Sequence, residues 1–134
     1  MEARELRSGN LLYGIYENIG VEANQETTEK RKDIVKFIGY DPWQNFLWVE
    51  GTINAEFYEE FEPIPLTEER LVRFGFTGTE FVMAYGNFLY FTDSKIMTWN
   101  GVILHHSIWN EVHKFQNLYF ALKGQELTFD EKTT

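Results

Sequence analysis

The chain has 134 residues, of which 43% are apolar and 17% aromatic, a composition that supports a folded domain and excludes an intrinsically disordered chain. It contains no cysteine, which excludes disulfides, cysteine nucleophiles and cysteine-ligated metals. The formal net charge is −9, and residues 50–69 alone carry seven glutamates and no lysine or arginine. Such a charge repels phosphates, so we do not expect direct binding to nucleic acid.

The first part of the chain predicts three strands. Alternating apolar residues predict a strand over 10–16, and the polar run over 16–33 predicts a long hairpin tip. A second strand is expected over 34–40, ended by Pro42, because proline cannot donate to a sheet ladder. A third strand is expected over 43–54, where large apolar side chains on both faces favour a central place in the sheet.

A short helix with clear ends is predicted over 67–74. Thr67 is a good N-cap, and Glu68 and Glu69 fall in the first turn, where the helix dipole favours negative charge. Gly75 stands where a left-handed residue commonly ends a helix, and Phe76 follows it to pack back.

The rest of the chain predicts an antiparallel meander and then a longer helix. Aromatic strands are expected over 80–85, 87–92 and 94–99, and Asn100-Gly101 predicts a type I′ turn into a strand at 102–106. Apolar residues at spacings of three and four predict a helix over 108–123, with Ser107 as its N-cap and Gly124 at its end. Residues 125–134 can add a short edge strand.

These elements predict an α+β fold in a single domain, residues 1–134. We expect a twisted antiparallel sheet, or a small SH3-like partial barrel, of six or seven strands with a short middle helix and a longer C-terminal helix. The similarity of the first three strands to an SH3-like barrel is an analogy that carries no function.

Three segments resemble a known family when they are taken together. They are Leu6–Leu11 (Leu-Arg-x-Gly-Asn-Leu), Ile64–Glu69 (within Pro-x-Pro-Leu-Thr-Glu-Glu) and His113–Leu122 (His-x-x-Gln-Asn-Leu-Tyr-Phe-Ala-Leu). The family consists of small uncharacterised proteins encoded by gut anaerobic bacteria and their phages. The resemblance implies a phage-related or mobile-element context in the cytoplasm, and it implies no chemistry.

The acidic segment is the first candidate interaction surface. Its candidate residues are Glu56, Glu59, Glu60, Glu62, Glu68 and Glu69. The surface could bind a protein partner or mimic the phosphates of a nucleic acid, and the simpler interpretation is a solvated acidic edge. A pair of carboxylates for acid–base chemistry would need a pocket that separates their pKa values, and nothing in the sequence implies one.

Three further residues could extend this surface. Trp43 and Trp99, near strand ends, could form an aromatic rim, and Gln116 is expected to project away from the apolar stripe of the last helix. The alternatives are ordinary cross-strand packing for the tryptophans and a local hydrogen bond for an amide of this helix. Lys30–Lys32 could touch a phosphate, although a solvated loop is the simpler interpretation.

The histidines provide the only route to a metal site. His106 and His113 are seven residues apart and would share a helix face if the last helix started early. This spacing matches no catalytic metal motif, and a third ligand would have to come from elsewhere, so we interpret the histidines as structural.

We therefore expect a non-catalytic protein-interaction module that uses the acidic surface around residues 56–69. We expect an unknown protein partner and no cofactor. We expect no contact with a membrane, because the longest uncharged stretch, 96–110, is too short to span a bilayer. We expect a cytoplasmic location, because the charged N-terminal residues lack the apolar run of a signal peptide. The alternatives are a nucleic-acid-related role, by mimicry or accessory binding, and, less favoured, a metal-dependent enzyme.

Overall fold

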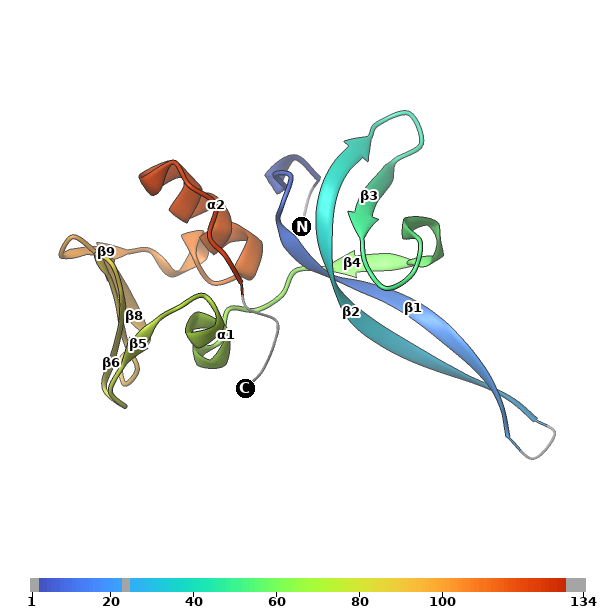
Figure 1. Ribbon diagram of the computed structural model, residues 1–134, viewed down its shortest axis with the longest axis horizontal. Coiled ribbons are helices and arrows are strands. Elements are labelled where there is room, and N and C mark those ends of the chain that lie inside the picture. The colour runs from blue at the N-terminus through green and yellow to red at the C-terminus, as the bar shows by residue number, and fades with distance from the viewer. Residues whose placement is uncertain (1–2, 23–24, 130–134) are drawn as a thin grey trace. The chain divides into compact units, whose positions relative to one another are not determined.

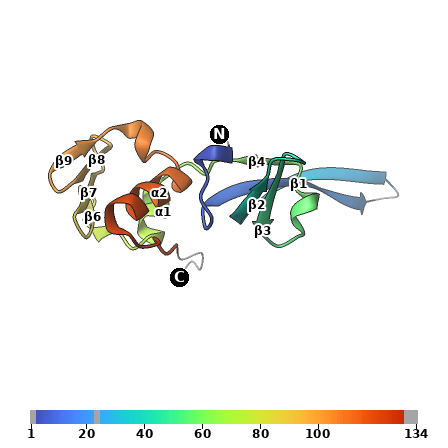
Figure 2. The ribbon, with the colours of Figure 1, turned by 90° about the horizontal axis from the view of Figure 1, so that it is seen from above.

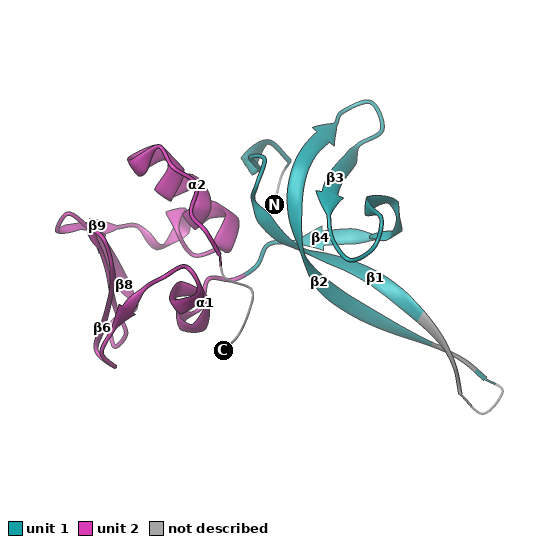
Figure 3. Ribbon diagram, in the orientation of Figure 1, with its two compact units in different colours: residues 1–64 teal, residues 65–134 magenta. Residues whose placement is uncertain are grey.

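The computed structural model describes residues 3–22 and 25–129, and they form an α+β structure as the sequence predicts. Figure 1 shows the order of the elements. Where the sequence predicts six or seven strands in one sheet, the described residues form nine strands in two open antiparallel sheets. The chain divides into two compact units, residues 1–64 (unit 1) and 65–134 (unit 2), each with its own sheet (Figure 3).

Unit 1 contains a four-stranded sheet in the order β3-β2-β1-β4. Its strands are β1 (Leu11–Glu22), β2 (Gln25–Asp41), β3 (Phe46–Glu50) and β4 (Glu60–Glu62), with 3-10 turns η1 (Ala3–Glu5) and η2 (Ala55–Phe57). The core side of this sheet buries six residues of one cluster: Leu12, Val35, Phe37, Val49, Ala55 and Tyr58.

The predicted hairpin tip over 16–33 is wrong for most of its length, because β1 and β2 continue through it as a paired ribbon. Glu17 lies opposite Lys30, and such opposite charges across a strand pair stabilise it. Residues 17–18 and 28–32 of this ribbon are exposed, and an exposed strand pair needs no apolar alternation, so the pattern of the sequence does not reveal it. Residues 23–24 of the tip lie outside the described residues.

The third predicted strand, β3, lies at an edge of the sheet and not at its centre. Val49 faces the core, whereas Trp48 remains 52% exposed on the other face and packs edge-on against Phe46, with ring centroids 4.8 Å apart. Phe46 is half-buried and packs against the core cluster, so only Trp48 of this aromatic pair lies largely in solvent.

Unit 2 contains a five-stranded meander in the order β5-β6-β7-β8-β9. Its elements are α1 (Glu68–Arg73), β5 (Thr77–Gly78), β6 (Val82–Tyr85), β7 (Phe88–Phe91), β8 (Ile96–Trp99), β9 (Val102–Leu104), η3 (His106–Ile108) and α2 (Val112–Lys123). In the part of unit 2 that the structure describes, both α-helices lie on the same side of the sheet, as Figures 1 and 2 show. Fully buried Phe115 of α2 joins the helices to the sheet through its contacts with Phe74, Phe76 and Phe88.

The local signals of unit 2 are confirmed. Thr67 caps α1, Gly75 follows that helix with φ at 107°, and Asn100-Gly101 has the two positive φ angles, 50° and 80°, that a type I′ turn needs. Gly124 ends α2 in the left-handed conformation with φ at 67°.

The start of the last helix differs from the prediction. Residues 106–108 form a 3-10 turn, in which the Ser107 amide donates to Nδ1 of His105, and α2 begins only at Val112 after Glu111. Ser107 is therefore not the N-cap of α2. The edge strand predicted for 125–134 is absent over 125–129, and residues 130–134 lie outside the described residues.

Candidate functional site

The acidic segment does not form one surface of one unit. Glu56, Glu59, Glu60 and Glu62 belong to unit 1, whereas Glu68 and Glu69 belong to unit 2. Each set therefore has to be considered with the unit that contains it.

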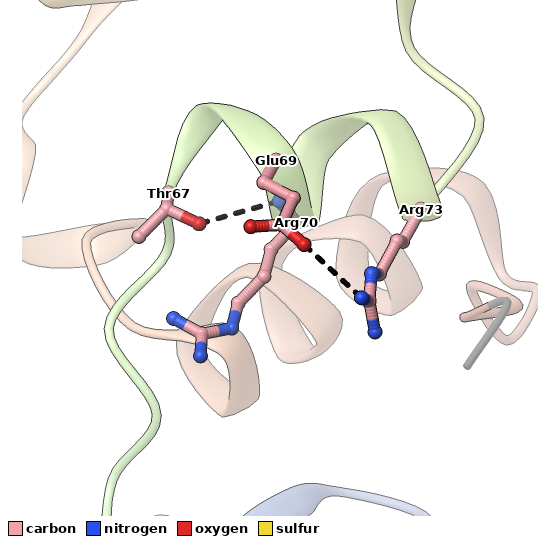
Figure 4. A network of polar contacts seen from close by, with 4 residues as sticks. All are labelled: Thr67, Glu69, Arg70 and Arg73. Carbon is pink, nitrogen blue, oxygen red and sulfur yellow. Dashed lines mark hydrogen bonds and ion pairs between the residues drawn. The ribbon is translucent and has the colours of Figure 1, made fainter. Parts of the chain in front are cut away.

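Half of these glutamates are paired with cations of their own unit. Lys32 Nζ lies 2.9 Å from Glu62, Lys95 Nζ lies 2.8 Å from Glu68, and Glu69 pairs with Arg73 at 3.0 Å, one turn along α1 (Figure 4). The hydrogen bond to Glu62 raises the pKa of Lys32, and the hydrogen bond to Glu68 raises that of Lys95. Among the described residues, Glu56, Glu59 and Glu60 form no ion pair, so the free negative charge of the segment lies in unit 1.

One of these unpaired carboxylates, Glu59, lines a cavity in unit 1 of about 350 Å³, which we call the aromatic pocket. Its lining comes from η1 and the segment after it, from the end of β2, the turn that follows and the start of β3, and from β4 and the segment that enters it. The described lining residues are Ala3, Leu6, Tyr40, Asn45, Phe46, Leu47, Tyr58, Glu59 and Phe61. Four of these nine are aromatic, and none of them is a lysine or an arginine.

Hydrogen bonds hold two tyrosine hydroxyls of the pocket and the backbone of Glu59. The Tyr40 hydroxyl donates to Oδ1 of Asn45 at 2.6 Å, across the turn between β2 and β3. The Tyr58 hydroxyl donates to Oδ2 of Asp33 at 3.0 Å, and the backbone N–H of Glu59 donates to the carbonyl of Ile15 at 2.8 Å. The backbone of Glu59 is therefore held by a hydrogen bond, whereas Glu59 as a whole is exposed to solvent.

Tyr58, which lines the aromatic pocket, can pack as it does because two glycines make room for it. A Cβ at Gly14 would lie 2.6 Å from Cδ1 of Tyr58, and a Cβ at Gly51 would overlap the Tyr58 hydroxyl. Burial raises the pKa of Tyr58, and the hydrogen bond to Asp33 adds to that rise. Tyr58 is therefore a neutral, rigid part of the pocket at physiological pH.

A second cavity, of about 680 Å³, lies in unit 2 between α1 and the segment around η3. Trp109 meets Tyr90 and His106 edge-on, at centroid distances of 5.9 and 4.9 Å, and the ion pair between Glu68 and Lys95 also lines the cavity. Glu69 and Arg70 line the cavity as well, so its lining has two acidic residues and two basic residues whose charges balance. The cavity thus gives no clear preference for the charge of a ligand.

The three further candidates are not brought together. Trp43 lies in the β2–β3 turn of unit 1, where it is 95% exposed and its backbone amide donates to the Asp41 side chain. Trp99 is half-buried and lies on β8 of unit 2. Gln116 is only 3% exposed, so the prediction that it projects outward is wrong. Helix α2 buries a wider face than its apolar stripe, and this face includes the polar residues His113 and Gln116.

The histidines do not form the shared helix face that a metal site would use. His106 lies exposed in η3, whereas His113 is fully buried in α2. In the described ranges 3–22 and 25–129, no group of three or more histidine, aspartate or glutamate side chains could hold a metal ion.

The basic triplet lies on β2 and not in a loop. Lys32 is paired with Glu62, and Arg31 lies 3.6 Å from Glu29. Phosphate binding by the triplet would therefore compete with existing ion pairs. Of the helices in the described part of the chain, none has the length and apolar character to cross a membrane.

Sequence patterns identify only Glu59 among the lining residues of the aromatic pocket. The available signal was the interleaving of aromatic and acidic residues over 56–62, together with aromatic residues on both sides of the Pro42 turn. The chain matches no protein-family model, and neither a curated protein nor a solved structure matches it.

Proposed function

We propose that the protein is a non-catalytic protein-interaction module whose aromatic pocket receives a cationic side chain of a protein partner. The observation that carries this proposal is the lining of the pocket: four aromatic side chains, an unpaired carboxylate and no described basic residue. The proposal keeps the interaction module expected from the sequence and moves its centre to Glu59.

An aromatic lining with one carboxylate is chemically suited to a cation. The face of an aromatic ring carries partial negative charge, and a lysine, arginine or other organic cation near the face gains about 0.5–2 kcal/mol, the larger value when the site is desolvated. Tyr40, Phe46 and Phe61 provide such rings, and Glu59 provides a full negative charge beside them. The apolar lining also favours the hydrocarbon stem of a lysine or arginine.

The charge of unit 1 supports the same class of partner. Residues 1–64 contain 13 acidic and 6 basic residues, a net charge of −7, whereas residues 65–134 contain 8 and 6, a net charge of −2. A field of this sign attracts a basic segment and increases its rate of association at low salt.

Binding of short basic peptides tests this function. Peptides containing lysine or arginine are titrated into the full chain at two salt concentrations, with glutamine-substituted peptides for comparison. We expect the basic peptides to bind, the affinity to fall as salt rises, and the glutamine peptides to bind weakly or not at all.

The variant Glu59→Gln and its control Glu56→Gln remove the same charge from the same unit. Glu56 is exposed and does not line the pocket. We expect Glu59→Gln to weaken binding by roughly fivefold and Glu56→Gln by less than about twofold. Equal losses in the two variants, or no binding of any basic peptide, would contradict the proposal.

We also propose that this module acts in the cytoplasm and in a phage-related context, as the resemblance of Leu6–Leu11, Ile64–Glu69 and His113–Leu122 implies. Mimicry of nucleic acid is the competing role for the acidic unit. A mimic would compete with DNA for a DNA-binding protein. If a protein partner bound to this chain is displaced by DNA, that result would favour mimicry. Release by a basic peptide alone would favour the aromatic pocket.

A further inference from the structure

We infer that the second cavity, in unit 2, binds a neutral saccharide through the hydroxyl of Tyr90. The cavity has a volume of about 680 Å³, which is within the usual range for the sites of small organic ligands. It lies wholly in unit 2, and its described lining residues do not overlap with those of the aromatic pocket. The inference therefore does not depend on the proposed function.

Tyr90 on β7 is the feature of this cavity that points to a ligand. The residue is only 6% exposed, and its ring packs edge-on against Trp109. The two charged groups that act on its hydroxyl, Lys95 and Glu68, both line the cavity, so the hydroxyl end of the side chain faces it. Within the described part of the chain, this hydroxyl makes no hydrogen bond.

The other two buried tyrosines of the described residues have partners for their hydroxyls. Tyr58 donates to Asp33, and Tyr119 forms a hydrogen bond with Tyr85. Buried polar groups in folded proteins are almost always hydrogen-bonded in this way. Tyr90 is the exception, so its hydroxyl is available to a ligand in the cavity.

The protonation of Tyr90 determines what the ligand has to offer at this position. Burial raises the pKa of Tyr90, so its hydroxyl remains protonated at physiological pH and can donate. The ligand atom that meets Tyr90 therefore accepts a hydrogen bond.

The charges around Tyr90 are already paired, which disfavours a ligand with a net charge. Lys95 Nζ lies 2.8 Å from Glu68, and Glu69 pairs with Arg73 at 3.0 Å (Figure 4). A carboxylate in the ligand would be attracted by Lys95 and repelled by Glu68, and an ammonium group would meet the reverse.

The ion pair between Glu68 and Lys95 still leaves acceptors and donors for a neutral ligand. A carboxylate accepts several hydrogen bonds and an ammonium group donates several, so one bond between them uses only part of this capacity. His106 in η3 also lines the cavity, and its exposed imidazole can donate or accept. Hydroxyl groups donate and accept without carrying charge, so a ligand with several hydroxyls, such as a saccharide, satisfies all of these groups together.

Binding of sugars to the full chain, with its tyrosine and tryptophan rings labelled for NMR, tests the inference. The neutral probes are the methyl glycosides of glucose, galactose and mannose. Each is compared with the methyl glycosides of the amino sugar and the uronic acid of the same configuration, which carry a positive and a negative charge.

We expect at least one neutral glycoside to shift the ring signals of Tyr90 and Trp109 until they saturate, while those of Tyr58 in unit 1 stay unchanged. We expect its two charged counterparts to bind more weakly, by about threefold or more. No shift at Tyr90 with any neutral glycoside, or a charged counterpart that binds as tightly as the neutral one, would overturn the inference.

Tyr90→Phe removes only the hydroxyl, and Tyr119→Phe is its control. Tyr119 is a buried tyrosine of the same unit and is not among the described residues that line the cavity. We expect Tyr90→Phe to weaken binding of the glycoside by about fivefold and Tyr119→Phe to leave it unchanged. Equal affinities of wild type and Tyr90→Phe would overturn the inference.

Stability distinguishes a ligand site from a structural role of the hydroxyl. Because the Tyr90 hydroxyl bonds to no described residue, Tyr90→Phe should unfold at the same urea concentration as wild type. Tyr119→Phe loses the hydrogen bond to Tyr85 and should unfold at a lower concentration. A similar loss of stability in Tyr90→Phe would show that its hydroxyl has a structural partner, and would overturn the inference.

Discussion

Tyr58 is the residue that connects most parts of unit 1. Its ring lies edge-on to Tyr16 of β1 and tilted against Phe61 of β4, at centroid distances of 5.8 and 5.9 Å. Its hydroxyl reaches Asp33 of β2. One side chain thus joins β1, β2 and β4 and also forms part of the aromatic pocket.

A methyl group at Gly14 should damage this arrangement. The new Cβ of Gly14→Ala would lie 2.6 Å from the Tyr58 ring, so we expect a loss of about 1–3 kcal/mol in the free energy of unfolding. Gly39→Ala on β2 is the control, since a Cβ there meets nothing within 4 Å. Urea unfolding of the two variants measures the difference, and equal stabilities would show that Tyr58 does not pack on Gly14 as described.

Alkaline pH should also act through Tyr58. Burial, followed by the hydrogen bond to Asp33, raises the pKa of Tyr58 above its ordinary value of 10.0, because both favour the protonated hydroxyl in the folded protein. The resulting stability is fully present below about pH 10 and is lost as the pH rises through the folded-state pKa. Urea unfolding at about pH 8 and about pH 11 should show a smaller pH-dependent loss for Tyr58→Phe than for wild type.

Other tyrosines keep part of this alkaline loss in the variant. Burial also raises the pKa of Tyr90 and of Tyr119 in unit 2. At neutral pH, Tyr58→Phe should itself be less stable by about 1 kcal/mol, because the hydrogen bond to Asp33 is lost. An unchanged alkaline loss in Tyr58→Phe would contradict the assignment to Tyr58.

At the scale of elements, α1 is only six residues long and depends on its ends. Thr67 Oγ1 accepts from the Arg70 amide at 3.3 Å, and Glu69 and Arg73 pair along the exposed side of the helix (Figure 4). At the other end, the Phe76 amide donates to the carbonyl of Leu71. Isolated helices of this length are not stable in water, so the cap and the packing of Leu71 have to hold it.

The cap of α1 can be tested by a pair of substitutions. Thr67→Ala removes the acceptor and is expected to lower the free energy of unfolding by about 1 kcal/mol. Thr67→Ser keeps a hydroxyl at the same place and should cost much less. Thermal unfolding compares the two, and similar midpoints would show that the Thr67 hydroxyl contributes little.

Sequence patterns predicted the elements whose signals are local. The cap at Thr67, the turn at Asn100-Gly101 and the left-handed Gly124 depend on a few neighbouring residues, and all three are confirmed. The ribbon of β1 and β2, the edge position of β3 and the burial of Gln116 depend on distant residues or on the width of a packed face. No local pattern contains that information.

The candidate site shows the same limit. Glu59 was singled out because acidic residues cluster around it, but the other residues of the aromatic pocket come from segments far apart in the sequence. Tyr40 and Phe61 line one cavity only because Ala55 of η2 and Tyr58 pack into the core and β4 then pairs with β1. Sequence patterns therefore identified the charge of the site and not its shape.

At the scale of the whole molecule, the two units have surfaces of different chemistry. Unit 1 has a net charge of −7 and contains the aromatic pocket, whereas unit 2 has a net charge of −2. Because none of the described lining residues of the pocket belongs to unit 2, we expect Ile103→Glu to leave the affinity for basic peptides unchanged. Peptide titration on the natively folded variant measures this, and a loss of affinity would show that unit 2 takes part in peptide binding.

The central claim is that a basic side chain enters the aromatic pocket, and ring chemical shifts measured during a titration test it most directly. A lysine- or arginine-containing peptide is added to protein labelled in its aromatic rings. We predict progressive shifts in Tyr40, Phe46 and Phe61, which line the pocket, while Phe88 and Phe115 in the core of unit 2 remain unchanged. Shifts confined to rings of unit 2, or no shift in any ring while the peptide binds, would contradict the claim.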